Sequence, residues 1–334
     1  MDFALSADQV ALRDAANELL DRRSSIAVVR AAMDRGGLPD AQLWSAMVEQ
    51  GWCGVAVPES LDGIGLGWVE AALLIEAAGA HVSPAPILSQ LVALDVMADT
   101  PWREGLLSGE VTAAITDDLD APVPYAPSAD VIVAIEADEL VAIELAAPPA
   151  VEAAMDLTRP LGFVRGARSS STVVGDADAV TRFRDLGSIA YAAELLGMAQ
   201  RCLDMSVAYA GERVQFGKPI GSFQAIKHRC ADMLVDVEGM RSVVWWAAWC
   251  ASARHDDVSV AASTAKIWCS DAATRVLSGA MQVHGGIGFT WEHDLHLYLK
   301  RTHLDALAFG SATWHRQRLA AILRDRVAAG GSVI

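Results

Sequence analysis

Apolar side chains recur every three or four positions through most of the first hundred residues, which is the spacing of one helix face. The first stripe follows Ser6 and Gln9, which have capping-box spacing, so that each side chain can bind the other residue's backbone N–H. Further stripes occupy residues 43–48, 71–78 and 87–97. We therefore predict an N-terminal helical domain over residues 1–105.

The pattern changes after residue 105. No Lys or Arg occurs from Glu104 to Thr158, prolines become frequent, and the apolar runs are short and β-branched. The clearest runs are residues 131–135 and 140–143. Short runs of this kind, separated by polar turns, are typical of paired strands. We expect a small, reduced β domain over residues 106–182 that leans on its neighbours.

Long helical stripes return from about Asp185 and continue to Val327. They cover residues 186–210, 226–244, 261–282 and 295–323. Four long helices with short connections form an antiparallel bundle, which we assign to residues 183–330. The predicted fold class is mainly α with a small β domain between two helical domains.

Composition and charge exclude several classes of protein. Hydrophobic residues make up 53% of the chain, and the net charge of −16 argues against nucleic-acid and anionic membrane partners. No run approaches the ~18 apolar residues of a membrane-spanning helix. Met1, Asp2 and Phe3 begin no signal segment, and the five cysteines form no Cys-x-x-Cys, so we expect a reduced, cytoplasmic protein.

The segment most suggestive of chemistry lies where the first long bundle helix ends. Gly217 suits the left-handed residue after a helix, Pro219 prevents continuation, and Ser222 can cap the next helix. Arg213 and Gln215 are thereby placed at a helix–helix corner, where a guanidinium can bind a pyrophosphate through paired N–H donors. Taken alone, an arginine that stabilises the helix dipole is the simpler interpretation.

A second segment, residues 281–290, joins two bundle helices and is rich in glycine. Gln282 can both donate and accept hydrogen bonds. Gly285 and Gly286 let a ligand or another chain approach the backbone closely, because they carry no side chain. Taken alone, such a loop indicates only a turn that ends a helix.

Together the two segments resemble the acyl-CoA dehydrogenase family, flavoproteins that desaturate acyl-CoA thioesters between Cα and Cβ. The resemblance covers most of the chain and rests on the combined spacing of several motifs. They are Gly51-Trp52, Pro58-Glu59, Ala193-Glu194-x-x-Gly197, Tyr209, Arg213-x-Gln215-Phe216-Gly217, Pro219-Ile220, Phe223-Gln224, Ala231-Asp232-Met233, Gln282 and Gly285-Gly286-x-Gly288. The resemblance implies an acyl-CoA dehydrogenase-like fold.

The resemblance also implies a cofactor. In this family the two motifs bind FAD from across a subunit interface. The matching residues are Arg213, Gln215, Phe216, Gln224, Gln282, Gly285 and Gly286. The arginine motif matches the part that holds the pyrophosphate and adenosine, the glycine loop lies beside the same group, and Gln224 matches a less regular contact.

The carboxylate that the family reaction requires is missing. It removes the α-proton while the β-hydride passes to the flavin, so it must lie within hydrogen-bond reach of that proton. Its usual position, counted from the glycine loop, holds Phe309. The alternative family position falls at residues 186–188, which carry no carboxylate, and neighbouring Asp185 is expected to cap the helix. We therefore predict no catalytic residue in this chain.

The β domain departs from the family as well. Full-length relatives cover the flavin ring with a Thr-Glu-Pro-type loop and a Gly-Ser-Asp segment, and residues 104–182 contain nothing similar. The resemblance thus implies a shortened, non-catalytic subunit of an α2β2 acyl-CoA dehydrogenase with two FAD. A longer partner subunit would supply the glutamate and bind most of the acyl-CoA, and an electron-transfer acceptor would take the electrons. Such pairs resemble actinobacterial enzymes of steroid side-chain catabolism.

Two other functions stay open at this point. The first is a complete homomeric enzyme with a relocated base, for which Glu194, His303 and Asp305 are candidates. The second is a flavin-free subunit that serves only for interaction.

Histidines and tryptophans near the C-terminal end add less. His293 and His296 share a helix face, but no ligand set at zinc spacing is completed, so no metal site is expected. Trp245, Trp246 and Trp249 cannot all face one core, so we expect at least one to face a partner.

Overall fold

The computed structural model describes residues 4–97 and 99–332. Met1, Asp2 and Phe3, on which the prediction of a missing signal segment rested, lie outside the described residues. None of the described helices is both long and apolar enough to span a lipid bilayer. All five cysteines are free thiols, and four of them are buried, as predicted.

The first part of the chain is helical, as expected. Its helices are α1 (Ala7–Arg23), α2 (Ile26–Asp34), α3 (Ala41–Glu49), α4 (Trp68–Ala80), α5 (Ile87–Val96) and α6 (Arg103–Ser108), with short 3-10 turns η1 (Trp52–Gly54) and η2 (Glu59–Leu61). The capping box is confirmed, because the Ser6 N–H donates to Gln9 Oε1 at 2.9 Å and the Gln9 N–H donates to Ser6 Oγ at 3.2 Å. Almost every residue of α5 is buried, so this helix forms a central part of the core.

The β region is one four-stranded sheet of order β1-β3-β4-β6. Its strands are β1 (Ala113–Thr116), β3 (Val131–Glu136), β4 (Glu139–Leu145) and β6 (Arg168–Gly175), and a separate ribbon pairs β2 (Val123–Pro124) with β5 (Leu161–Gly162) on either side of η3 (Ala126–Ser128). The predicted pairing of 131–135 with 140–143 is confirmed. Ala137 and Asp138 both have positive φ, which fits a two-residue hairpin turn.

The C-terminal part forms the helix bundle, with two differences from the expected elements. Its helices are α7 (Ala177–Glu212), α8 (Gln224–Ser252), α9 (Val258–His284), α10 (Leu295–Asp305) and α11 (Ala312–Ala328). First, α7 begins eight residues before the expected Asp185. Second, the stripe over residues 295–323 is two helices, because Phe309 and Gly310 adopt positive φ and Ser311 starts α11 as its N-cap. The domain boundaries at 105 and 182 stay a prediction.

Close backbone contact fixes how the N-terminal helices sit on the bundle. A Cβ atom on Gly197 of α7 would lie 1.9 Å from the carbonyl oxygen of Glu76 in α4. One on Gly79 of α4 would lie 2.3 Å from the carbonyl oxygen of Glu194. Both positions therefore require glycine, and this crossing holds Glu194 in the interior.

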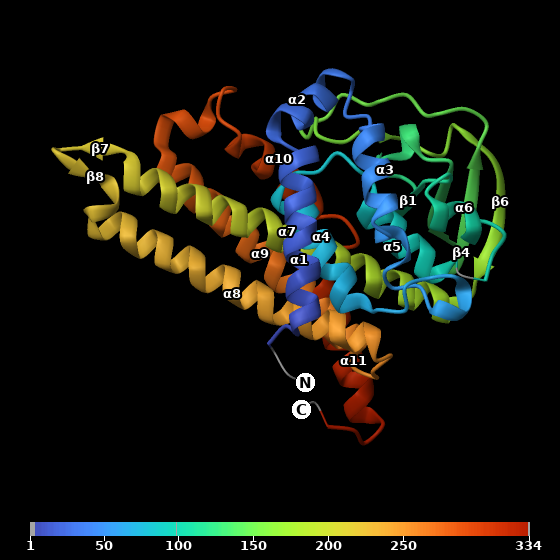
Figure 1. Ribbon diagram of the computed structural model, residues 1–334. Coiled ribbons are helices and arrows are strands. Elements are labelled where there is room, and N and C mark those ends of the chain that lie inside the picture. Colours follow the sequence, from blue (N-terminus) through green and yellow to red (C-terminus); the bar gives the residue numbers. More distant parts are fainter. Residues whose placement is uncertain (1–3, 98, 333–334) are drawn as a thin grey trace.

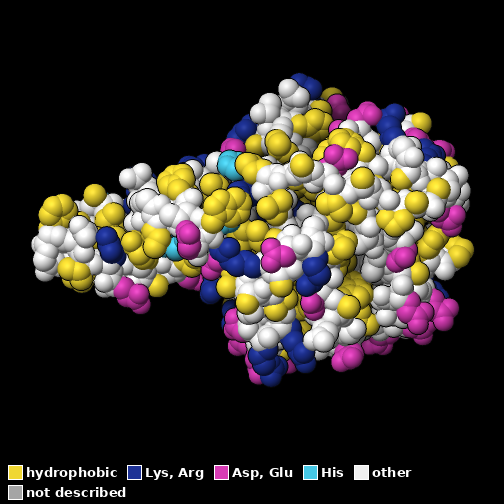
Figure 2. Space-filling model, turned by 90° about the horizontal axis from the view of Figure 1, so that it is seen from above, with side chains coloured by type: hydrophobic (Ala, Val, Ile, Leu, Met, Phe, Trp, Pro, Cys, Tyr) yellow, Lys and Arg dark blue, Asp and Glu magenta, His cyan; other side chains and the backbone are white. Residues whose placement is uncertain are grey.

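One end of the bundle projects from the rest of the molecule (Figures 1 and 2). It consists of the C-terminal end of α7, the hairpin of β7 (Val214–Gln215) and β8 (Lys218–Pro219), η4 (Ile220–Ser222) and the start of α8. We call residues 204–232 the arm. Figure 2 shows hydrophobic side chains gathered along this projection, where this chain alone does not cover them.

Candidate FAD half-site and the missing base

The arginine motif forms a hairpin at the tip of the arm. Helix α7 ends at Glu212, and Phe216 and Gly217, with φ of 54° and 78°, form the two-residue turn between β7 and β8. The expectation that Gly217 directly follows the helix was wrong, because a short ladder intervenes. Ser222 likewise does not cap α8, whose N-cap position is Phe223.

The motif residues on the arm are exposed and have no polar partner in their own chain. Phe216 is 90% exposed, and Arg213, Gln215 and Gln224 are exposed as well. Within the described residues, none of these three polar side chains makes a hydrogen bond or an ion pair. The Phe223 ring supports the hairpin through two contacts. The Phe216 ring packs edge-on against it at a centroid distance of 6.1 Å, and the Lys218 ammonium lies 4.4 Å from its centroid.

The glutamine–glycine motif forms a second open surface, at the end of α9. Gln282 is exposed, and Gly285, with φ of 62° and ψ of −141°, starts the 3-10 turn η5 (Gly285–Phe289). That backbone conformation is accessible essentially only to glycine. A Cβ atom on Gly285 or Gly286 would meet nothing within 4 Å, so the backbone there is open to a ligand or a partner chain.

The fold brings the two motifs together although about 70 residues separate them in the chain. The rings of Tyr209, one turn before Arg213, and His284, next to Gly285, stack at 4.6 Å with an interplanar angle of 21°. Nothing in the local sequence pattern pairs these two rings, so the contact was not predicted.

The chemistry of this surface fits part of FAD. An unpaired guanidinium and exposed amides suit the pyrophosphate and ribose, an exposed phenyl ring suits the adenine face, and bare glycines allow close approach. Every one of these groups is exposed or half-exposed. The arm can therefore form one wall of a dinucleotide site.

The position of the missing base is filled with aromatic carbon. Phe309 is 3% exposed, and its ring packs against Phe183 at 5.1 Å and Tyr191 at 5.7 Å. A Cβ atom on Gly187 would lie 2.2 Å from the Phe309 ring. The two family positions for the glutamate thus meet at one place in the fold, and neither holds a carboxylate there.

The carboxylate nearest to this place in sequence, Asp185, is already engaged. It lies in the third turn of α7, so the expectation that it caps the helix was wrong. Its carboxylate pairs with Arg318 at 2.7 Å and accepts a hydrogen bond from Ser259 at 2.6 Å. Burial raises the pKa of Asp185, and the Arg318 charge opposes that shift.

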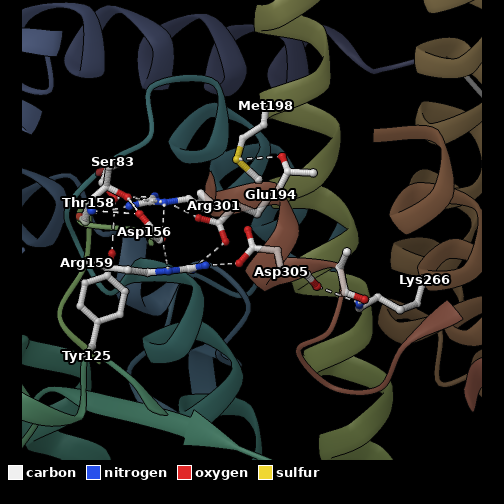
Figure 3. Close-up of polar contacts among 12 residues, drawn as sticks. Ser83, Tyr125, Asp156, Thr158, Arg159, Glu194, Met198, Lys266, Arg301 and Asp305 are labelled. Atoms are coloured by element: carbon white, nitrogen blue, oxygen red, sulfur yellow. Dashed lines mark hydrogen bonds and ion pairs between the residues drawn. The ribbon is translucent and has the colours of Figure 1, made fainter. Parts of the chain in front are cut away.

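Glu194 and Asp305, two of the candidate relocated bases, belong to a buried charge cluster. We use this name for Asp156, Arg159, Glu194, Lys266, Arg301 and Asp305, all of which are buried. Figure 3 shows the Arg159 and Arg301 side chains running next to each other toward the carboxylates. Glu194 binds Arg159 at 3.4 Å and Arg301 at 3.3 Å, and Arg159 also pairs with Asp305 and, at 3.2 Å, with Asp156.

The cluster balances three acids with three bases, which is what burial of charges requires. Burial raises the pKa of Asp305 well above its ordinary value, and Arg159 opposes this shift. The Lys266 ammonium donates to the carbonyls of Asp305 and Ala306 at 2.8 and 3.0 Å, and burial lowers its pKa to about 8. These contacts hold Asp305 and Glu194 in structural pairs.

The sequence contained one overlooked signal for the cluster. Arg159 is the first basic residue after a long stretch without Lys or Arg. An arginine directly after such a stretch could have been predicted to meet buried acids. The third candidate base, His303, is exposed and lines a pocket of about 520 Å³ with Trp291, Lys300 and other residues, away from Phe309.

The remaining expectations concern metals and tryptophans. Among the described residues, no group of three or more His, Cys, Asp or Glu side chains is placed to hold a metal ion. Trp245, Trp246 and Trp249 are each half-buried and pack against the helical core. Whether one of them also faces a partner stays a prediction.

Comparison with known proteins decides the family. The model for the acyl-CoA dehydrogenase N-terminal domain matches residues 6–100, and that for the C-terminal domain matches residues 178–323. The acyl-CoA dehydrogenase IpdE2 of Mycolicibacterium smegmatis is 35% identical over 328 residues, which are 95% of this chain and 99% of the relative. This chain belongs to the acyl-CoA dehydrogenase family. The predicted family and fold class are thereby confirmed.

Two solved structures of heteromeric members of the acyl-CoA dehydrogenase family are similar over nearly their whole length. The ChsE4–ChsE5 complex from Mycobacterium tuberculosis has a chain with a TM-score of 0.87 and 25% identity, with 97% of this chain and 99% of that chain covered. The Tcur3481–Tcur3483 steroid acyl-CoA dehydrogenase variant has a chain with a TM-score of 0.85 and 26% identity, with 96% of this chain and 99% of that chain covered. FAD is the cofactor of the family, whose members oxidise a CH–CH bond of an acyl-CoA thioester.

Proposed function

We propose that this chain is the non-catalytic subunit of a heteromeric acyl-CoA dehydrogenase. It supplies part of an FAD site across the subunit interface, and a longer partner supplies the catalytic glutamate, the cover of the flavin ring and most of the acyl-CoA pocket. The observation that carries the proposal is the packing of Phe309 against Gly187, which fills both family positions of the base with a phenyl ring. A bound flavin would supply the acceptor for the β-hydride.

The residues of this chain would bind and orient the cofactor. The Arg213 guanidinium, which has no acidic partner among the described residues, would neutralise pyrophosphate charge. Gln215, Gln224 and Gln282 would hydrogen-bond the polar edges of the adenosine portion, and Phe216 would cover its flat face. Because Gly285 and Gly286 have no side chains, they leave room for the same part of the cofactor.

An exposed apolar surface beside the glycine loop supports a protein partner. Phe289, Trp291 and Met155 are 72%, 59% and 59% exposed, and they line one pocket. Contiguous exposed aromatic and aliphatic side chains mark interaction surfaces. Because this surface adjoins Gln282 and Gly285, a subunit that covers it would also close the second wall of the FAD site.

The relatives support the class of substrate and the assembly. One structural neighbour is described as a steroid acyl-CoA dehydrogenase, and the other is a complex of two different chains. We propose a cytoplasmic α2β2 tetramer with two FAD that acts on the CoA thioester of a steroid side chain and passes electrons to an electron-transfer acceptor.

Co-expression with longer acyl-CoA dehydrogenases, one at a time, tests this function. We expect a stable complex of two chain types whose mass fits four chains and whose absorbance gives two FAD. The complex with Arg213→Ala should assemble and lose most of its FAD. The matched control is Arg324→Ala, an arginine near the C-terminal end and far along the chain from both FAD motifs, which should keep the flavin.

Two results would contradict the proposal. If this chain purified alone binds one FAD per chain and oxidises an acyl-CoA, it is a complete enzyme. Glu194→Gln and Asp305→Asn would then identify its base. If the Arg213→Ala complex keeps its full flavin content, the chain serves for interaction without holding FAD.

A further inference from the structure

The two motifs of the half-site meet at a pair of stacked rings. Tyr209 lies in the last turn of α7, and His284 is the last residue of α9. Among the described residues, no hydrogen bond or ion pair connects the final two turns of α7 to residues 281–290. Within the apolar packing of α7 against α9, the stack is therefore the contact that directly links the residue one turn before Arg213 to the residue next to Gly285.

The His284 side of the pair is fixed within its own loop. The ring is buried, and its Nδ1–H donates to the Ala280 carbonyl at 2.9 Å. The His293 ring packs against it edge-on at 4.7 Å. A Cβ atom on Gly288 would lie 3.2 Å from the His284 Cβ, so η5 also folds closely over this side chain. His284 is therefore a fixed reference point for Gly285 and its neighbours.

The Tyr209 side of the pair is connected to the arginine through the backbone. The Arg213 N–H donates to the Tyr209 carbonyl at 2.9 Å, and the Arg213 carbonyl accepts from the Ile220 N–H at 2.8 Å. These bonds make the last helical turn and the hairpin one unit. A shift of Tyr209 would therefore also shift the start of the hairpin that carries the guanidinium.

We infer that the Tyr209–His284 stack is a positioning device for FAD, an inference that rests on the proposed function. It sets the separation between Arg213 and the open backbone at Gly285, so that both meet one dinucleotide without first having to be ordered. A binding surface held in its bound geometry avoids the free-energy cost of ordering it on association. Tyr209 and His284 act through the residues next to them.

The ring of Tyr209, and not its hydroxyl, carries this role. The hydroxyl makes no hydrogen bond with any described residue, whereas the ring lies nearly parallel to the imidazole. Tyr209→Phe should therefore behave as the native chain, and Tyr209→Ala should not. A stacked aromatic pair contributes about 0.5–1.5 kcal/mol, which corresponds to a change of about two- to tenfold in an equilibrium constant.

The test uses the co-purified complex, stripped of flavin and titrated with FAD while flavin fluorescence is recorded. Light scattering verifies that each variant complex keeps its mass. We expect the FAD dissociation constant to rise about two- to tenfold for Tyr209→Ala and for His284→Ala, and to stay within about twofold for Tyr209→Phe. The double alanine variant should bind no more weakly than the weaker single variant, because both changes break the same contact.

Several outcomes would overturn the inference. One is an unchanged FAD dissociation constant for Tyr209→Ala. Another is a double variant whose loss of affinity for FAD equals the sum of the two single losses, which would mean that the two rings contact FAD separately. If the Tyr209→Ala complex does not assemble, Tyr209→Leu replaces it, since leucine keeps the apolar bulk but has no ring to stack. A native FAD dissociation constant for Tyr209→Leu would overturn the inference in the same way. Arg213→Ala distinguishes this inference from the proposed function. If Arg213→Ala weakens FAD binding while Tyr209→Ala binds FAD as the native complex does, the role of the stack is refuted and the proposed function stands.

Discussion

Arginines occur in two contrasting settings in this molecule. In the buried charge cluster, Arg159 and Arg301 are almost fully enclosed, and each meets at least two carboxylates. On the arm, Arg213 is exposed and its side chain meets no acid among the described residues. In the buried cluster each arginine is paired within the chain. On the arm the charge of Arg213 stays available to a ligand or a partner chain.

The difference separates residues that hold the fold from residues that serve a site. A buried charge without a partner is costly, so each carboxylate of the cluster needs a cation beside it. An exposed charge carries no such cost and can stay unpaired until a ligand arrives. Glu194 and Asp305 are both enclosed in this cluster and paired with Arg159, which favours a structural role for them.

The cluster also supports the loop that carries Phe309. Lys266 donates to the carbonyls of Asp305 and Ala306, which end α10. Three residues later Phe309 adopts a positive φ, an unfavourable conformation for a bulky side chain, and its carbonyl accepts from His315 Nε2–H at 2.8 Å. The loop is thus held in a shape that points a phenyl ring into the core.

The largest expected effect comes from removing one arginine of each kind. Arg301→Met should destabilise the chain by about 3–5 kcal/mol, because it removes one buried charge and leaves Glu194, Asp156 and Asp305 with Arg159 as their only ion-pair partner among the described residues. Arg213→Met should change stability by no more than about 0.5 kcal/mol. Urea unfolding of both variants measures the difference, and equal effects would remove the distinction between the two settings.

A carboxylate introduced at the buried aromatic site should not act as a base. Phe309→Glu should lower stability by about 4 kcal/mol, because it removes ring packing and buries a carboxyl among Phe183 and Tyr191. Phe309→Leu should lose less, since it stays apolar. We expect no acyl-CoA oxidation by either variant alone, in an assay with added FAD and a dye acceptor. Turnover by the glutamate variant alone would show that the acyl pocket is intact.

The buried side should also respond to acid. Burial lowers the pKa of His315 to about 4, so between pH 6.5 and 4 the unfolded chain binds a proton that the folded chain does not. The stabilising contribution is complete above pH 6.5 and is lost as the pH falls through 4, by up to about 3 kcal/mol. His315→Gln should flatten the stability profile in this window. An identical slope in the variant and the native chain would contradict the assignment.

The smallest expected effect on folding lies at the tip of the arm. Phe216→Ser should leave the urea midpoint of the isolated chain unchanged within error, because the ring is already in water. The same change should weaken FAD binding in the complex. Phe183→Ala is the matched buried control, with an expected loss of about 3–5 kcal/mol. A large stability loss for Phe216→Ser would mean that the hairpin packs against its own chain.

Local spacing in the sequence was enough to predict much of the fold. The helix–sheet–bundle order, the capping box at Ser6 and the pairing of 131–135 with 140–143 follow from periodicity, which depends only on near neighbours. The proposed FAD motifs around Arg213 and Gly285 came from their resemblance to the motifs of the family. The prediction that this chain lacks the base came from the same resemblance, which puts Phe309 at the usual position of the glutamate.

Tertiary structure decided which of these residues meet. Arg159 and Asp305 are 146 positions apart, and Tyr209 and His284 come from different helices, so no local pattern could pair them. The break at Phe309 and the hairpin at Gly217 were missed because each depends on left-handed backbone that packing or a short ladder holds in place. Periodicity shows which face of an element is apolar, whereas only the folded chain determines which charges and rings come into contact, since that depends on where whole elements cross.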